Sequence, residues 1–341
     1  MNTLRRSFAA IALLVAAALP CQDAPLTQIE KPLLWRIELP TPSYLYGTIH
    51  LPDERVTTLP AVVTEAIDSC GALYTEIPME LDKMMAAAKG AMQPAGSSLA
   101  DEIGAELYAR TKAYVESRGA KMQMFDRVRP WVAATQLTVV DIMPQLARQQ
   151  PLDMQLYAKA KKAGKTVGGL ETVESQLAVF DDLTLEEQCS MLTATLDQLE
   201  KQAAEGKNPT EELLQTYLRG DEAGLDKVIN EAPLGDDELH DKLEQRLLAN
   251  RNGGMVDRIV EELQKHPGRG AFFAVGAAHH VGEQGVVALL IERGYRVTRV
   301  ELKPGGAAAR TEADAIDAEI ARRTAEIEAL KARRAKLLLL R

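Results

Sequence analysis

Short apolar runs alternate with long amphipathic stretches along this chain of 341 residues. Short runs rich in β-branched and aromatic side chains are typical of buried strands. Such runs are found at 33–39, 44–49, 72–77, 166–171, 272–275 and 295–300. Only the turn residues at 40–43 separate the first two runs, which predicts an antiparallel hairpin.

Helical spacing of apolar residues dominates the middle of the chain. It predicts helices within 81–146, 152–163, 185–204, 210–228, 236–266 and 285–293. Because the strands cluster in the outer thirds, we expect an α/β fold rather than a regular βαβ repeat. The fold would be a small mixed sheet with a large helical insertion, at about 80–165 and 180–265. The helix at 285–293 would link its two neighbouring strands in a βαβ-like unit.

The N-terminus has the pattern of an export signal. Arg5 and Arg6 precede an apolar stretch at 9–19, which is too short for a comfortable membrane span. We therefore expect residues 1–20 to be a signal peptide, cleaved near Ala18, and the protein to be periplasmic or secreted. A lipoprotein anchored to the membrane through Cys21 is the second interpretation, because that processing requires a small residue where Pro20 stands.

The C-terminal segment 307–341 contains neither Gly nor Pro and follows a break at 304–306. Its apolar residues fall on heptad a and d positions, but Arg323 and Arg334 interrupt the seam. The pattern predicts a helical tail with a weak coiled-coil signal. Such a tail would serve self-association or pack on the domain.

Composition narrows the class of protein. Hydrophobic residues make up 46% of the chain, enough for a full core. The net charge is −9 and no basic cluster occurs outside the extreme C-terminus, which argues against a nucleic-acid partner. No G-x-S-x-G motif supports serine hydrolase chemistry. Only Cys70 and Cys189 would remain in a form cleaved beyond Cys21, and for these two both a disulfide and two free thiols are open.

Two Gly-x-x-His motifs carry the candidate chemistry. One runs from Gly47 to His50 and the other from Gly276 to His279, and each follows a predicted strand. Glycine at a strand end permits close backbone approach, and strand ends are where α/β folds bind ligands. Two imidazoles meeting at one place are typical of a divalent-metal site. A hydrogen-bonded structural histidine is the alternative for each.

Two acidic residues end other predicted strands, Glu76 and Glu171. If the strands share a direction, these carboxylates and both histidines project toward one rim. Glu76 would then complete a three-ligand metal site that keeps a position for water, and Glu171 could act as general base. Arg251, which precedes two glycines, is a candidate for stabilising a developing anion. The alternatives are an exposed strand-end charge for Glu76, an N-cap-like or salt-bridged residue for Glu171, and a surface arginine for Arg251.

Together these motifs resemble the TraB/GumN family. YLYGTIHL at 44–51 is similar to the family's YLxGTxHL opening, and GLETVESQL at 169–177 to its GLET…EQL segment. FAVGAAH at 273–279, followed by GEQGV at 282–286, is similar to its last motif. The resemblance runs from Leu33 to about Val300 and implies one domain over 33–303.

The family includes the TIKI proteins, which are metal-dependent proteases of animal cells. The resemblance therefore implies a metallohydrolase in which His50, His279 and Glu76 bind Mn, Co or Zn, with a peptide or protein as substrate. Arg251 matches a family arginine that usually follows Glu, but here Asn250 precedes it, and His280 stands where Leu is frequent. The wider fold group resembles the ChaN and erythromycin-esterase proteins. This likeness allows an ester-cleaving protein, or a non-catalytic envelope protein that binds haem or another ligand, as an alternative. An envelope assembly factor that acts through its helices is a further alternative.

Overall fold

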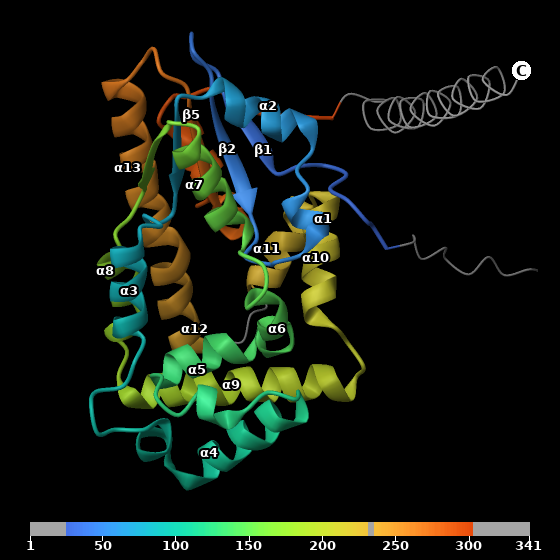
Figure 1. Cartoon of the computed structure of the whole chain (residues 1–341), viewed down its shortest axis with the longest axis vertical. Helices are drawn as coiled ribbons and strands as arrows, with labels where there is room; N and C mark the ends of the chain where they lie inside the picture. The colour runs from blue at the N-terminus through green and yellow to red at the C-terminus, as the bar shows by residue number, and fades with distance from the viewer. Residues whose placement is uncertain (1–24, 231–234, 303–341) are drawn as a thin grey trace, which may run out of the picture.

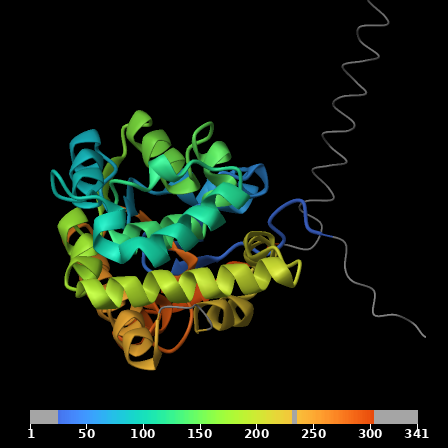
Figure 2. The ribbon, with the colours of Figure 1, turned by 90° about the horizontal axis from the view of Figure 1, so that it is seen from below.

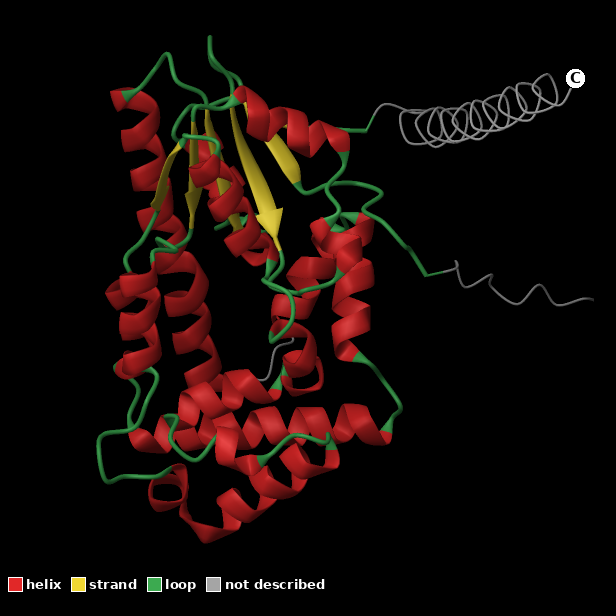
Figure 3. Cartoon of the chain, viewed as in Figure 1, coloured by secondary structure: helices red, strands yellow, loops and turns green. Residues whose placement is uncertain are grey.

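Six strands form one mixed sheet in the order β4-β3-β5-β2-β1-β6. The computed structural model describes residues 25–230 and 235–302, and Figure 3 shows its strands gathered at one end, in yellow. The strands are β1 (Leu34–Ile37), β2 (Ser43–Thr48), β3 (Ala72–Thr75), β4 (Thr166–Gly169), β5 (Ala271–Gly276) and β6 (Val297–Arg299). The predicted α/β class with a mixed sheet is confirmed. The predicted signal peptide, Cys21 and the predicted tail lie outside the described residues.

The four strands β4, β3, β5 and β2 are adjacent and parallel. Their carboxyl ends therefore lie at the same edge of the sheet, the condition that the sequence left open. β1 pairs antiparallel with β2, with Leu34 opposite Tyr46, so the predicted hairpin is confirmed. β5 is buried along its whole length, which explains its continuous apolar sequence, AFFAVG.

Helices cover the sheet and form a second layer away from it. In chain order they are α1 (Glu54–Thr57), α2 (Ala61–Ser69), α3 (Leu81–Gly90), α4 (Leu99–Ser117), α5 (Pro130–Leu137), α6 (Met143–Leu146), α7 (Leu152–Lys162), α8 (Val173–Asp181), α9 (Leu185–Ala204), α10 (Pro209–Arg219), α11 (Glu222–Asn230), α12 (Asp237–Glu244), α13 (Asn250–Lys265) and α14 (Val286–Glu292). A π-helical turn at Gln245–Ala249 joins α12 to α13. Figure 1 shows α2 and α7 in front of the sheet and α4, α5 and α9 below it. Figure 2 shows α9, in yellow-green, crossing this lower end.

Local sequence signals set the ends of several helices. Thr184 caps α9 because its hydroxyl accepts a hydrogen bond from the Glu187 N–H, and the Glu187 carboxylate accepts one from the Thr184 N–H. Gly220, in the left-handed region at φ 60°, ends α10, so the helical pattern over 210–228 is divided into two helices. Gly164, at φ 76°, follows α7 as predicted.

Two hydrophobic clusters hold these layers together. One surrounds the sheet and includes Phe272 and Phe273, and the other lies among α4, α5 and α9 and includes Leu137. Cys70 is buried in the first cluster, Cys189 packs against the second, and both are free thiols. The disulfide that the sequence left open is therefore not formed. Within the described ranges, no helix is long and apolar enough to cross a bilayer.

His280 is buried against the sheet. Its ring stacks on Trp35, with 5.0 Å between the ring centroids. Neither ring nitrogen has a hydrogen-bond partner of good geometry among the residues that the structure describes. Burial, with a smaller contribution from His279, lowers the pKa of His280 to about 3. The folded protein therefore holds a neutral ring here and disfavours its protonation.

Replacing His280 with Leu should stabilise the protein, most of all at mildly acidic pH. The folded-state pKa is about 3 and an unfolded histidine titrates near ~6.5. Between these values the unfolded chain binds more protons, so wild-type stability falls as the pH drops below about 6.5. The advantage of His280→Leu should grow by about 1.4 kcal/mol between pH ~7.5 and ~5.5, measured by urea unfolding. An advantage that does not change with pH would contradict a buried neutral ring.

Candidate metal centre at the ends of the parallel strands

The parallel strands bring the predicted site residues to one edge of the sheet. Glu76 directly follows β3, and Glu171 lies two residues beyond β4. His50 lies two residues beyond β2, and His279 ends a short 3-10 turn that follows β5. Because β3 lies between β4 and β5, Glu76 is placed between Glu171 and His279.

Gly276 marks the point on which three of these side chains converge. Its N–H donates to Glu76 Oε1 at 2.8 Å. A Cβ built on Gly276 would lie 2.8 Å from Glu76 Oε1, 3.7 Å from His279 Cδ2 and 3.8 Å from His50 Nε2. The backbone here, at φ −49° and ψ 137°, suits any residue. Glycine is therefore required for space, which it leaves open between a carboxylate and two imidazoles.

His50 is fixed by a residue that the sequence did not single out. Its Nδ1 lies 2.8 Å from Oδ2 of Asp153, a buried residue of α7. The Thr48 hydroxyl donates to the other carboxylate oxygen of Asp153 at 2.5 Å. The Asp153 charge raises the pKa of His50 above its usual value. The His50 side chain is 63% exposed, so it is the open side of the arrangement.

His279 is held in a comparable way by an amide. Its Nδ1 lies 2.6 Å from Asn252 Oδ1, and Asn252 Nδ2 donates to the Gln284 carbonyl at 2.8 Å. Burial lowers the pKa of His279 to about 4, so the ring is neutral at pH 7. The other ring nitrogen, Nε2, lies 3.8 Å from Glu76 Oε1. A neutral imidazole beside a carboxylate is a suitable pair of metal donors.

Arg251 joins the two carboxylates. Its Nη2 lies 2.7 Å from Glu76 Oε2 and 2.6 Å from Glu171 Oε1. Burial raises the pKa of Glu76, but His279, His50 and Arg251 outweigh it and bring the pKa below its usual value. For Glu171, burial outweighs the opposing Arg251 and raises the pKa. Glu76 is therefore held as an anion, whereas Glu171 is the more easily protonated carboxylate.

The other two nitrogens of Arg251 also form hydrogen bonds. Its Nε donates to both oxygens of Glu171, at 3.0 and 3.1 Å, and its Nη1 to the Leu247 carbonyl at 3.2 Å. Glu171 is therefore salt-bridged, which was one of the two interpretations of the sequence. Its role as a base, and the role of Arg251 toward an anion, stay predictions.

Sequence reasoning missed Asp153, Asn252 and Gln176, whose amide donates to Glu76 Oε2 at 3.1 Å. Asp153 lies in the first turn of a helix, where acidic residues are common for reasons unrelated to a site. Asn252 directly follows Arg251, and this adjacency was the only signal available. The contacts of Asp153 with His50 and of Asn252 with His279 join residues far apart in the sequence, so no local pattern predicts them.

The donors suit a divalent ion in kind. Two imidazoles and a carboxylate are the ligands that Zn²⁺ and related ions prefer, and Gly276 leaves space among them. In the part of the chain that the structure describes, however, no group of three His, Cys, Asp or Glu side chains already has the geometry of a metal site.

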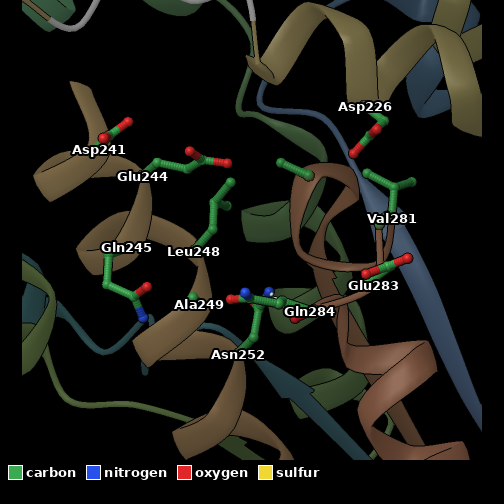
Figure 4. Close-up of a pocket in the computed structure, with 12 residues that line it drawn as sticks. Asp226, Asp241, Glu244, Gln245, Leu248, Ala249, Asn252, Val281, Glu283 and Gln284 are labelled. Atoms are coloured by element: carbon green, nitrogen blue, oxygen red, sulfur yellow. Dashed lines mark hydrogen bonds between the residues drawn. The ribbon is translucent and has the colours of Figure 1, made fainter. Parts of the chain in front are cut away.

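Two cavities lie on either side of α13. One, of about 640 Å³, is lined by Asn252, Ala278 and four carboxylates: Asp226, Asp241, Glu244 and Glu283. Figure 4 shows Asn252 and Gln284 side by side within it, between the helical segment that carries Glu244 and the loop that carries Glu283. The other, of about 610 Å³, is lined by Glu171, Arg251 and Arg246 among others. Neither lining includes His50, Glu76 or His279. The cavities adjoin the site through Asn252 on one side and through Glu171 and Arg251 on the other.

Comparison with known proteins agrees with the motif pattern. Residues 33–299 match the model of the TraB/PrgY/gumN family. Metalloprotease TIKI2 of Danio rerio is 28% identical over 81% of this chain and 62% of its own length. Metalloprotease TIKI1 of Homo sapiens is 28% identical over 81% of this chain and 63% of its own length. An uncharacterized protein of Treponema pallidum is 24% identical over 68% of this chain and 67% of its own length.

The chain spans less than two thirds of the length of the TIKI1 and TIKI2 relatives named above, 62% for TIKI2 of Danio rerio and 63% for TIKI1 of Homo sapiens. No solved structure matches the chain. The predicted likeness to the ChaN and erythromycin-esterase fold group therefore stays a prediction.

Replacing Gly276 with Ala should destabilise the protein. The added methyl group would lie 2.8 Å from Glu76 Oε1, and Glu76 cannot retreat freely because Arg251 and Gln176 hold its other oxygen. We expect a loss of roughly 1–3 kcal/mol in the free energy of unfolding, measured with urea. Gly253→Ala is the matched control, because its Cβ would meet nothing within 4 Å inside a helix. It should raise stability by up to about 1 kcal/mol. Equal stability of Gly276→Ala and wild type would contradict the crowded position.

Proposed function

The chain belongs to the TraB/PrgY/gumN family, and from this membership we propose that it is a metal-dependent hydrolase that cleaves peptide bonds. The observation that carries the proposal is the convergence of His50, Glu76 and His279 around Gly276. The name metalloprotease, which the TIKI relatives carry, supports the reaction class. The activity, substrate and partners of the whole protein are likewise proposals.

His50, Glu76 and His279 would hold the ion. Mn²⁺, Co²⁺ and Zn²⁺ all accept such a donor set. When bound, the ion would polarise a substrate carbonyl and lower the pKa of a bound water. Gly276 keeps the space between the donors open, since even a methyl group there would press on Glu76.

The charges buried near this site also favour a cation. Glu76 and Glu171, whose side chains are largely buried, share the guanidinium of Arg251, and a third carboxylate, Asp153, is buried beside His50. In the metal-binding form, with both imidazoles neutral, the group would carry two surplus negative charges. Without metal, Asp153 raises the pKa of His50 to about 9, so the protonated ring offsets one of them. Buried charge is costly unless it is paired. A divalent cation would balance this surplus.

Glu171 is the proposed general base. Burial raises its pKa, and a carboxylate with a raised pKa accepts a proton more readily at neutral pH. Arg251 lies at 2.6 Å from Glu171 and 2.7 Å from Glu76. It would keep both carboxylates in place and supply positive charge where an oxyanion develops.

A peptide or protein is the proposed substrate. The cavities of about 640 and 610 Å³ on the two sides of α13 provide space for chain segments beyond the scissile bond. We further propose that the protein acts in the periplasm or after secretion, because Arg5, Arg6 and the apolar stretch 9–19 have the pattern of an export signal. Anchoring through Cys21 and self-association through the tail stay predictions.

Glu171→Gln should keep the metal and lose most turnover. The substitution preserves shape and removes the base, and general bases contribute roughly 10²- to 10⁴-fold to rate. Cleavage of an unbiased peptide library with Mn²⁺, Co²⁺ or Zn²⁺ would be read by mass spectrometry. Glu186→Gln, an exposed residue in the first turn of α9, is the control and should cleave as wild type does. If Glu171→Gln cleaves equally well, the base is another residue.

Elemental analysis of the same preparations separates metal binding from catalysis. Wild type and Glu171→Gln should contain stoichiometric metal, and His50→Ala and His279→Ala should lose it. A folded, metal-loaded wild type that cleaves no peptide with any metal would refute the peptidase proposal. Haem absorbance without a transition metal would favour the ligand-binding alternative.

A further inference from the structure

Each candidate histidine is bonded through Nδ1 to a buried side chain from the helical insertion. His50 meets Asp153 of α7 at 2.8 Å, and His279 meets Asn252 of α13 at 2.6 Å. We propose that Asp153 and Asn252 are positioning residues that fix both histidines as Nδ1–H tautomers and thereby turn both Nε2 atoms toward the site. The part of this inference that concerns metal binding rests on the proposed function.

The hydrogen-bonding capacity of the Asp153 carboxylate determines the tautomer of His50. A carboxylate accepts hydrogen bonds and does not donate them. One Asp153 oxygen accepts from the Thr48 hydroxyl at 2.5 Å, and the other lies 2.8 Å from His50 Nδ1. The hydrogen of the second bond must therefore come from Nδ1. The lone pair of a neutral ring is then on Nε2.

Asn252 sets His279 in a different way, because an amide can both donate and accept. Its Nδ2 donates to the Gln284 carbonyl at 2.8 Å, and a carbonyl can only accept. This bond orients the amide so that Oδ1 faces His279 Nδ1 at 2.6 Å. Nδ1 must therefore carry the hydrogen, and the lone pair is on Nε2. Figure 4 shows Asn252 beside Gln284 in the cavity next to α13.

The two Nε2 atoms accordingly lie on the site side of their rings. His279 Nε2 is 3.8 Å from Glu76 Oε1, and His50 Nε2 is 3.8 Å from a Cβ built on Gly276. Both positioning residues are themselves buried, at 3% and 2% exposure for Asp153 and Asn252. Because these two partners are buried, water cannot readily replace either of them as the acceptor for Nδ1.

The first test reads the tautomers directly and requires neither metal nor activity. Protein labelled with ¹⁵N-histidine would be studied by long-range ¹H–¹⁵N correlation at a pH at which both rings are neutral. His50→Gln and His279→Gln assign the signals. Wild type should show Nδ1–H for both residues. Asp153→Asn, whose amide can turn its NH₂ group toward the ring, should lose that state at His50.

At His279, a pair of variants separates the hydrogen bond from simple packing. Asn252→Leu keeps the approximate size but offers no acceptor, so the Nδ1–H signal should be lost. Asn252→Asp keeps an acceptor toward the ring and should retain the signal, although it no longer donates to Gln284. Glu262→Gln is the control, a buried acid three turns further along α13 that bonds the Tyr74 hydroxyl. It should change neither histidine.

Calorimetric titration of the same proteins with Zn²⁺ then measures the consequence. Loss of such a partner usually costs about 10- to 100-fold in metal affinity, and we expect this for Asp153→Asn and Asn252→Leu but not for Glu262→Gln. Nε2–H tautomers in wild type, or Nδ1–H signals that survive in both variants, would overturn the inference. If Asn252→Leu does not fold, the wild-type and Asp153→Asn spectra still decide. Wild type with both Nδ1–H tautomers but no metal binding would refute the metal site and support the orientation.

Discussion

The shared direction of four neighbouring strands is the constraint on which the rest of the site depends. Because β4, β3, β5 and β2 run parallel, their carboxyl ends meet at one edge, and residues more than 200 positions apart in the chain become neighbours. The bond from the Gly276 N–H to Glu76 Oε1, at 2.8 Å, joins the ends of β5 and β3 directly. If β3 ran antiparallel to β5, Glu76 would lie at the opposite edge of the sheet from Gly276.

Electrostatics explains why this edge needs the helical insertion. Buried carboxylates are costly without partners, and the sheet alone supplies Glu76 and Glu171 without a cation. α13 contributes Arg251, which bonds both, and through the next residue, Asn252, it also holds His279. α7 contributes Asp153 to the other histidine. The insertion therefore provides the groups that neutralise and orient the strand-end residues.

The spacing of apolar residues predicted those parts of the molecule that depend on neighbouring residues in the sequence. The hairpin, the buried strands and the helices follow from apolar spacing, and the candidates His50, His279, Glu76 and Glu171 follow from positions at strand ends. Asp153 and Asn252 could not be predicted, because their importance arises only when a helix packs against a strand end. Arg251 was identified as a candidate, but its two carboxylate partners depend on the same packing. The burial of His280 is likewise a result of packing, since no local pattern indicates it.

The central claim is that both Gly-x-x-His histidines bind one ion together with Glu76. Crystals of the protein with the metal that it retains through purification would locate that ion by anomalous scattering. We expect one peak at about 2.0–2.2 Å from His50 Nε2, His279 Nε2 and a Glu76 oxygen. A peak at any other position, or coordination by only one of the two histidines, would contradict the shared site.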